Sequence, residues 1–283
     1  MRLSRDDADI FVPDQQTPAA ALARVTHLCV SAHQDDIEIM AHAGIAECVE
    51  SKGAKAFGGV VVTNGAGSPR AGKYAMFTDD EMPRIRRDEQ RHAAELGRYA
   101  IQIQLAHPSA HVKSGDCPEV LEDLTAIFGA CSPEVVYLHN PADKHDTHVA
   151  VLLRCIEALR ALPPGRRPQR VLGCEVWRDL DWLVDADKVA LDSGRQPRLA
   201  ARLLATFDSQ IAGGKRYDLA TVGRRKAHAT FSASHANDKL KGITWAMDLT
   251  PLMHDSELDV AEYTLGYVDR LRDEIATRIR RYD

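Results

Sequence analysis

Two short segments of the chain hold histidines and aspartates close together. The first is SAHQDDIEIM, at residues 31–40, and the second is HNPADKHDTHVA, at residues 139–150. Their side chains that can bind a metal ion or move a proton are His33, Asp35, Asp36, Asp143, His145, Asp146 and His148. A zinc site that hydrolyses a bond needs about three protein ligands and one open position for water. His33, Asp36 and His148 are suited to be those ligands.

The other side chains have separate tasks in such a site. Asp35 lies next to a ligand without having to be one, so it can accept a proton from a water molecule that the metal activates. Zinc lowers the pKa of a bound water from about 15.7 to about 7, which makes hydroxide available at neutral pH. A protonated His145 can stabilise the oxyanion of a tetrahedral intermediate or give a proton to the leaving amine. In the simplest alternative, these polar residues only mark strands that end in water-facing loops.

Both segments follow stretches that favour β-structure. Runs of β-branched and apolar residues predict five strands, at residues 24–32, 54–65, 99–106, 133–140 and 170–177. Helical spacing predicts helices between them, at residues 37–53, 79–97, 117–130 and 148–162. Strands that alternate with helices indicate an α/β fold, with a mostly parallel sheet and helices on both of its faces.

The expected order of these strands brings the two polar segments together. In doubly wound sheets a ligand binds beyond the carboxyl ends of the strands, where the strand order reverses. In the common order 3-2-1-4-5, the first and fourth strands are neighbours at that reversal. His33 follows the first strand and Asp143 follows the fourth. We therefore expect the two segments to face each other across one crevice.

The two ends of the chain lack this alternating pattern of strands and helices. After residue 178 the strand pattern disappears and the sequence becomes mostly helical, including residues 197–214, residues 219–236 and a last helix at the end of the chain. We expect the following division: a loosely held N-terminal lead-in at residues 1–23, and one α/β domain at residues 24–283, with a catalytic core at 24–180 and a helical C-terminal elaboration at 181–283.

The two segments also carry a resemblance. AHQDDIEI and HNPADKHDTH, with VVVTNGAGSPRAGKYAMFTDDEMPRIRRDEQRHAAELG between them, resemble the PIG-L/LmbE-like family of zinc-dependent N-deacetylases. The family motifs are usually written A-H-P-D-D-E and H-x-D-H, and the resemblance covers roughly residues 25–180. It implies a Rossmann-like fold, one Zn²⁺ per chain and removal of an acetyl group from the nitrogen of an N-acetylglucosamine-type sugar or conjugate.

The resemblance also implies roles for individual residues. It makes His33, Asp36 and His148 the zinc ligands, Asp35 the general base and His145 the electrophilic histidine. The R-x-x-E segment, in which family members often hold the sugar, falls on Arg86 and Glu89 here. The alternative for this pair is an exposed ion pair on a helix, which contributes little stability.

The chain departs from the family motifs at the histidine of the second segment. Thr147 replaces the aspartate of H-x-D-H, so the carboxylate expected to orient and charge His145 is missing from that position. Asp143 or Asp146 is expected to take its place. If neither does, His145 is harder to keep protonated.

Departures in and near the first segment concern residues that need not bind metal. Gln34 replaces the usual proline, and Ile37 stands where glutamate is common, with Glu38 beside it. His42 stands where the family prefers glycine, and we expect it to be packed rather than to bind metal. His139 ends the fourth strand and is a candidate to support a ligand from behind.

The loop NGAGSPRAGKYAMF, at residues 64–77, follows the second strand and therefore opens on the same rim. Its glycines, Arg70 and Tyr74 suit a segment that grips substrate or closes over it. The competing interpretation is a phosphate-binding loop. GAGSPRAG lacks the GxxxxGK[ST] spacing of such loops, which argues against nucleotide binding.

Composition limits the remaining classes. The chain has 283 residues, 45% hydrophobic content and a net charge of −5, with basic residues spread along it, so no clustered nucleic-acid footprint is present. No stretch approaches the roughly 18 apolar residues of a membrane span and the N-terminus has no apolar signal region, so we expect a cytoplasmic protein. The six cysteines form no CxxC pair and are expected to pack as small core residues.

The sequence therefore favours a zinc-dependent amide hydrolase that acts on an acetylated amino sugar or glycoconjugate. Two alternatives stay open, a metal-dependent hydrolase of another bond such as a phosphoester, and a relative that binds a sugar without turnover. Family members often form oligomers, so a homo-oligomer is possible here. The identity of the acetylated amine depends on loops that the sequence does not resolve.

Overall fold

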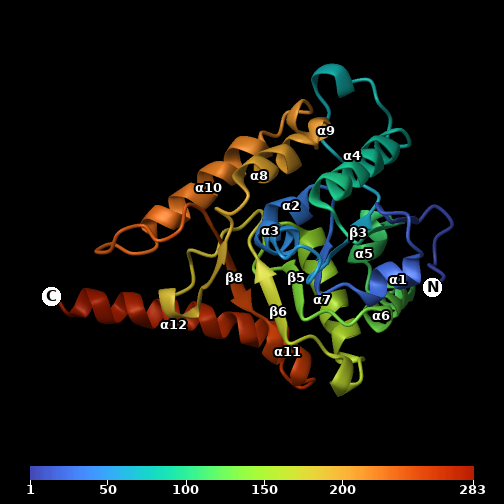
Figure 1. Ribbon diagram of the computed structural model, residues 1–283. Coiled ribbons are helices and arrows are strands. Elements are labelled where there is room, and N and C mark those ends of the chain that lie inside the picture. Colours follow the sequence, from blue (N-terminus) through green and yellow to red (C-terminus); the bar gives the residue numbers. More distant parts are fainter.

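A computed structural model describes residues 1–283. One sheet of eight strands runs through it, in the order β1-β4-β3-β2-β5-β6-β8-β7 (Figure 1). The strands are β1 (Asp9–Phe11), β2 (His27–Ser31), β3 (Phe57–Thr63), β4 (Ile101–His107), β5 (Val135–His139), β6 (Arg170–Cys174), β7 (Val189–Asp192) and β8 (Ile243–Asp248). Strands β2 to β6 correspond to the five predicted strands and pair in parallel. Their order is the predicted 3-2-1-4-5, so the parallel α/β arrangement is confirmed.

Helices fill the connections between the strands. They are α1 (Pro18–Ala23), α2 (Asp36–Met40), α3 (His42–Glu50), α4 (Met82–Gly97), α5 (Ser109–Lys113), α6 (Pro118–Ala130), α7 (Asp146–Arg160), α8 (Pro197–Ala205), α9 (Asp208–Ile211), α10 (Tyr217–Phe231), α11 (Thr250–His254) and α12 (Val260–Arg280), with 3-10 helices η1 (Gly72–Tyr74), η2 (Pro164–Arg166) and η3 (Asp185–Asp187). The resulting sheet has helices on both of its faces.

One predicted helix, at residues 37–53, is divided into α2 and α3. The break falls at Ala41, whose backbone is not helical. The guanidinium of Arg225, on α10, donates hydrogen bonds to the carbonyl oxygens of Glu38 and Ile39 at 2.8 and 3.0 Å. Because a distant side chain satisfies these carbonyls, they need no partner in a following turn of α2. The sequence signal for one continuous helix was therefore overridden by a tertiary contact.

Both ends of the chain contribute strands that the sequence did not predict. The expectation of a loosely held lead-in is wrong, because β1 pairs antiparallel with β4 and α1 buries Ala21 and Leu22. The expectation of a C-terminal part without strands is also wrong. β8 pairs antiparallel with both β6 and β7, which extends the sheet at its other edge.

Apolar side chains pack on both faces of the sheet. The larger cluster joins the sheet to residues of α6, α7 and α11, and the smaller cluster joins it to residues of α2, α3, α4 and α8. All six cysteines are free and buried, as expected for small core residues. The burial of both faces fixes the strands in register, so the loops at their carboxyl ends are held at defined positions.

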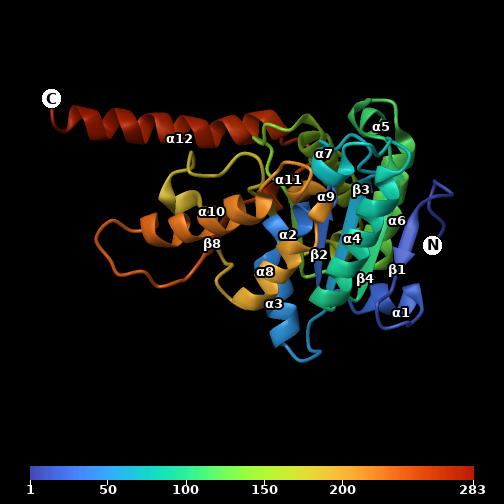
Figure 2. The ribbon, with the colours of Figure 1, turned by 90° about the horizontal axis from the view of Figure 1, so that it is seen from above.

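The C-terminal helix α12 leaves the body of the protein. Figures 1 and 2 both show it projecting beyond the sheet toward the C-terminus. Its N-terminus is capped by Asp259, whose carboxylate accepts a hydrogen bond from the backbone of Glu262. Tyr267 is its one buried side chain. None of the helices combines the length and the apolar character required to cross a bilayer.

Candidate functional site

The turn between β2 and α2 presents the first polar segment. The carboxylate of Asp36 accepts a hydrogen bond from the backbone N–H of His33 at 2.8 Å, which closes the turn onto the start of the helix. Asp35, between them, has φ 93° and ψ −31°. Positive φ is uncommon for a residue with a side chain and persists where the surroundings enforce it. The turn therefore directs two neighbouring carboxylates to different places.

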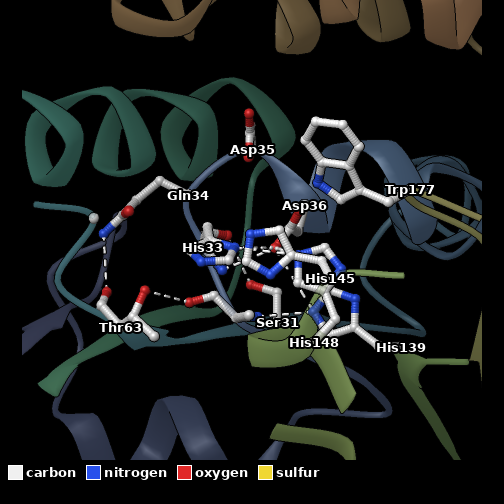
Figure 3. A network of polar contacts seen from close by, with 12 residues as sticks. Ser31, His33, Gln34, Asp35, Asp36, Thr63, His139, His145, His148 and Trp177 are labelled. Carbon is white, nitrogen blue, oxygen red and sulfur yellow. Dashed lines mark hydrogen bonds and ion pairs between the residues drawn. The ribbon is translucent and has the colours of Figure 1, made fainter. Parts of the chain in front are cut away.

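Three side-chain atoms from two distant segments meet beyond the ends of β2 and β5. His33 Nδ1 lies 3.2 Å from Asp36 Oδ2 and 3.2 Å from His148 Nε2, and the last two atoms are 3.3 Å apart. Donor atoms about 2.0 Å from a tetrahedral zinc ion lie about 3.3 Å from each other. The triangle therefore has the size that one Zn²⁺ with a fourth, open position requires. Figure 3 shows Asp36 turned toward the imidazoles and Asp35 set apart from them.

The charges of this triangle suit a cation. Burial lowers the pKa of His33 to about 4, so its imidazole is neutral at pH 7 and has a lone pair to offer. Burial also opposes a charge on His148, but Asp36 and Asp143 raise the pKa of His148 to about 9. Burial opposes ionisation of Asp36 as well, yet His148 and His33 hold the pKa of Asp36 well below its ordinary value. His148 therefore holds a proton that balances the charge of the Asp36 carboxylate. A metal ion bound by the same side chains would supply that positive charge in place of the proton.

Asp143 lies behind His148, on the opposite side of the ring from the triangle. Its Oδ1 is 3.6 Å from His148 Nδ1 and accepts the backbone N–H of His145 at 2.9 Å. Its Oδ2 accepts the backbone N–H of Trp177 at 3.0 Å. A carboxylate in this position fixes the orientation of a metal-binding histidine. Asp143 therefore supports His148, whereas the sequence suggested it as a partner for His145.

The ring of His145 has no carboxylate against it. Its Nδ1 is buried without a hydrogen-bond partner, and the ring stacks on His148 with 4.6 Å between centroids. Asp146 is exposed at the first turn of α7, and Thr147 is buried beside the cavity. Burial lowers the pKa of His145, and the charge of His148 lowers it further. The structure thus favours a neutral His145 at neutral pH.

His139, at the end of β5, supports the cluster without facing the cavity. The backbone N–H of Ala32 donates to His139 Nε2 at 2.9 Å, so the lone pair of that nitrogen is occupied. Its ring stacks on His148 with 3.8 Å between centroids. His139 Nε2 is 3.6 Å from Asp36, but its hydrogen bond leaves it unsuited to bind a metal ion.

A cavity of about 710 Å³ lies directly over these residues. Its walls come from the loops that follow β2, β3, β5 and β6, together with residues of α5, α9 and α10. His33, Asp35, Asp36 and His145 all line it. This is the place at which parallel sheets of this order bind ligands, so a substrate in the cavity would lie against the triangle of His33, Asp36 and His148.

Arg86 lines the cavity and is not exposed to bulk solvent. It is 3% exposed, donates to the backbone oxygen of Gln34 at 2.6 Å and lies 3.7 Å from Asp35 Oδ1. The alternative of an exposed ion pair with Glu89 is therefore wrong. Glu89 instead accepts hydrogen bonds from the backbone and hydroxyl of Ser209, at 2.7 and 2.5 Å, and so anchors α9.

Arg70 and Tyr74 were predicted to bind substrate, but neither lines the cavity. Arg70 pairs with Asp79 and donates to the backbone of Ala66 at 2.7 Å. The Tyr74 hydroxyl donates to Asp208 at 2.6 Å, which ties the loop at residues 64–77 to α9. The loop does reach the cavity, through Gly65, Gly67, Ser68 and Pro69. In this structure Arg70 and Tyr74 act as anchors of the loop.

The residues that depart from the family motifs are buried beside the site. The Gln34 amide donates to the backbone of Thr63 at 3.3 Å and to Gln104 at 3.2 Å, so it ties the turn to two neighbouring strands. Glu38 accepts hydrogen bonds from Tyr99 and Gln90 at 2.8 and 2.9 Å, and burial raises its pKa to about 7. His42 is packed as expected, with Nε2 2.9 Å from the backbone oxygen of Arg195.

Sequence reasoning missed several residues of the cavity wall. They are Glu175, Trp177, Lys215, Tyr217, Arg224 and Arg225. A signal existed for Trp177, because it ends the fifth predicted strand, at the same rim as the two polar segments. No comparable signal existed for the residues after 210, because their position depends on how α9 and α10 fold over the site.

Comparison with known proteins gives a family and a fold. Residues 28–159 match the family model described as "PIG-L: GlcNAc-PI de-N-acetylase". A search among curated proteins gives no significant match.

Several solved structures resemble about four-fifths of the chain. The N,N'-diacetylchitobiose deacetylase of Pyrococcus horikoshii is 16% identical, with 81% of this chain and 85% of that chain covered and a TM-score of 0.61. The 4-carboxy-2-hydroxymuconate hydratase of Pseudomonas putida KT2440 is 18% identical, with coverage of 80% and 97% and a TM-score of 0.58. The A40926 pseudoaglycone deacetylase is 17% identical, with coverage of 80% and 98% and a TM-score of 0.55. At these identities the comparisons establish a shared fold.

Proposed function

Residues 28–159 form a PIG-L (GlcNAc-PI de-N-acetylase) family domain, and from this premise we propose that the protein is a zinc-dependent N-deacetylase. Its substrate is an N-acetylglucosamine-type sugar or conjugate, and its products are acetate and the free amine. The observation that carries the proposal is the triangle of His33 Nδ1, Asp36 Oδ2 and His148 Nε2, with sides of 3.2, 3.2 and 3.3 Å.

The donor set fits one zinc ion per chain. Two imidazole nitrogens and one carboxylate oxygen form a known ligand set of hydrolytic zinc sites. When bound, Zn²⁺ supplies a Lewis acid that polarises an amide carbonyl and activates water at neutral pH. Asp143 holds the third ligand, His148, in orientation from behind. Side chains that could hold a metal ion form two groups in this region, one of His33, His145 and His148 and one of Asp36, His139 and His148. Both groups contain His148, so they do not form two independent metal sites.

Asp35 is proposed as the general base. It lines the cavity and is only 6% exposed. Burial raises the pKa of its carboxyl well above the ordinary value, while the charge of Arg86 opposes that increase. A carboxylate with a raised pKa is a better proton acceptor. In the reaction, water adds its oxygen to the acetyl carbon, Asp35 takes the proton, the C–N bond breaks and the nitrogen receives a proton.

His145 is proposed as the electrophilic residue beside the reacting carbonyl. Because no carboxylate pairs with its ring and burial lowers its pKa, we assign it a neutral imidazole that donates one hydrogen bond. That hydrogen bond stabilises the developing oxyanion or directs a proton to the leaving nitrogen. Arg86 is proposed to contact the sugar, since it lines the cavity on the side of Ser68. Arg70 and Tyr74 take no part in this proposal, because they lie outside the cavity.

Release of acetate tests the proposal. The zinc-loaded protein is incubated with N-acetylglucosamine, N,N'-diacetylchitobiose and acidic N-acetylated sugars, and acetate is measured by an enzyme-coupled assay. We expect turnover that stops on chelation and returns with one equivalent of zinc. Asp35→Asn should lose activity by about 10²-fold or more while it still binds zinc. Because a hydratase has the same fold, absence of acetate from every acetylated amine would overturn the assignment.

A further inference from the structure

The cavity carries an excess of positive charge, although the whole chain carries −5. Three carboxylates line it, against six basic side chains, which are Arg86, Lys113, Lys144, Lys215, Arg224 and Arg225. Cations that gather around a cleft with low-dielectric walls concentrate the field inside it and attract anions. A zinc ion bound to the triangle would add to this field.

The three carboxylates leave five of these six cations without an ion-pair partner. Asp36 faces His33 and His148, and Asp35 faces Arg86. Glu175 accepts the backbone N–H of Trp245 at 3.0 Å and lies 3.1 Å from His228 Nδ1. Of the six basic side chains, only Arg86 forms an ion pair with a carboxylate.

Two of the unpaired cations are held in place on the wall of the cavity that Val176 and Trp177 form. The Lys215 ammonium lies over the ring of Trp177, 5.1 Å from its centroid. The Arg224 guanidinium donates a hydrogen bond to the backbone oxygen of Val176, the residue before Trp177. Both side chains are half-buried, whereas Lys113 and Lys144 are exposed at the rim. Arg225 differs from this pair, because its guanidinium is committed to the end of α2.

Aromatic rings connect the two cations to the catalytic side of the cavity. Trp177 lies 6.1 Å from the ring of His145, and Tyr217 meets Trp177 edge to face at 5.9 Å. The apolar face of a sugar ring packs well on such a surface, and a group beyond the sugar would reach the cations. Lys215 and Arg224 therefore lie on the wall of the cavity that contains Val176 and Trp177.

We propose that Lys215 and Arg224 form an anion subsite, and that the substrate is an acetamido sugar that carries a carboxylate or a phosphate in addition to its acetamide. This inference rests on the proposed deacetylase function and specifies its substrate class. The acetamide lies at the triangle, the sugar ring lies against Trp177, and the anionic group lies between the Lys215 ammonium and the Arg224 guanidinium.

Matched substrates test the charge preference. We compare kcat/KM for N-acetylglucosamine, N-acetylglucosamine 6-phosphate and N-acetylmuramic acid, so that the two acidic sugars distinguish phosphate from carboxylate. We expect at least one acidic sugar to exceed the neutral one about tenfold or more at low salt. The advantage should shrink when NaCl is raised from about 0.05 to about 0.5 M, because salt screens the attraction. Equal kcat/KM for all three sugars would overturn the subsite while leaving the deacetylase assignment intact.

Variants locate the effect. Lys215→Gln and Arg224→Gln, alone and combined, should reduce the ratio of acidic to neutral kcat/KM, by about tenfold in the double variant, through a higher KM for the acidic sugar. Lys226→Gln is the matched control, because Lys226 is exposed on the same helix α10 and does not line the cavity. An equal loss in Lys226→Gln, or an unchanged ratio in the double variant, contradicts the assignment of these two residues.

Binding gives a readout that does not depend on turnover. Calorimetric titration of the zinc-loaded wild type and double variant with N-acetylglucosamine 6-phosphate and N-acetylmuramic acid should show about tenfold weaker binding of the preferred sugar to the variant. Equal affinity would rule out the subsite. Because binding is measured directly, the anion subsite can be supported or rejected even if no acetate is released and the proposed function fails.

Discussion

The Nδ1 atom of His148 lies 3.6 Å from Asp143 Oδ1, while the Nε2 atom of the same ring faces His33 and Asp36 at 3.2 and 3.3 Å. One imidazole thus joins a supporting carboxylate to the metal-binding triangle. Asp143 is itself held by the backbone N–H groups of His145 and Trp177. The carboxylate that the second motif lacks at Thr147 is therefore supplied from an earlier position, but to a different histidine.

Asp143→Asn should weaken zinc binding. The substitution removes the negative charge beside His148 and replaces one acceptor oxygen by a donor, so either the Trp177 backbone N–H loses its acceptor or the histidine loses its support. We expect the Kd for zinc to rise about 10- to 100-fold, as for other carboxylates behind metal ligands. Competition with a chromophoric chelator measures it. Asp146→Asn is the control, since Asp146 is exposed, and an equal Kd for both variants would contradict the role given to Asp143.

Zinc should stabilise the fold through a single site. We expect one zinc ion per chain by elemental analysis, and an increase of about 3 kcal/mol in the free energy of unfolding at hundredfold excess over Kd. Thermal denaturation with zinc and with chelator measures this difference. His148→Gln should abolish it, whereas His92→Gln, which changes an exposed histidine of α4, should leave it unchanged. Two zinc ions per chain would instead favour a paired-metal hydrolase.

The buried His42 should make the free energy of unfolding decrease as the pH becomes acidic. It is 1% exposed and contacts the backbone oxygen of Arg195. Burial, together with the charge of Arg225, lowers its pKa from 6.5 to about 4. Because the unfolded chain binds this proton more tightly, the contribution of neutral His42 is complete above pH 6.5 and is lost as the pH falls toward 4. The free energy of unfolding that neutral His42 contributes, and that is lost at low pH, is of the order of 3 kcal/mol.

His42→Gln isolates this contribution, because the other titrating groups are common to both proteins. We expect urea denaturation to show wild type losing more stability than the variant between pH 7 and about 4.5, whatever their difference at pH 7. Parallel stability curves over this range would show that His42 is not held neutral by its surroundings.

The central strands were predictable because each has at least five residues, most of them apolar or β-branched, and four of the five are followed by a helix pattern. β1 and β7, which have three and four residues, are too short to give a periodic signal, and β8 lay within a stretch that looked helical. These three strands lie at or near the edges of the sheet, where pairing to a neighbour decides the conformation more than local sequence does.

The proximity of His33, Asp36 and His148 was also predictable from sequence, because each of them lies in a segment that follows a predicted strand. Which histidine Asp143 supports was not predictable from the sequence. His145 and His148 lie within one turn of each other, and only the fold decides which ring Asp143 faces. The subsite of Lys215 and Arg224 was equally inaccessible, because α10 approaches the loop of Trp177 from more than 30 residues away along the chain. Local sequence patterns therefore predict the candidate reacting residues. The residues of the cavity wall depend on long-range packing, which those patterns do not show.

Gly65 holds the loop after β3 close to Gln34 and Arg86. Its φ is +73°, a conformation that residues with side chains rarely adopt. A Cβ atom there would lie 2.5 Å from Gln34 Oε1 and 2.9 Å from Arg86 Cδ. Both side chains are buried, so neither can move without disturbing the turn that carries Asp35.

Gly65→Ala should therefore lower both stability and activity. We expect about 1–3 kcal/mol less stability in urea denaturation, from the backbone strain and the overlap. We also expect a larger loss in kcat/KM than global unfolding explains, because Arg86 must shift relative to Asp35. Gly67→Ala is the matched control, because Gly67 lines the same cavity and its Cβ would meet no atom within 4 Å. If both variants behave alike, Gly65 does not determine the position of Arg86.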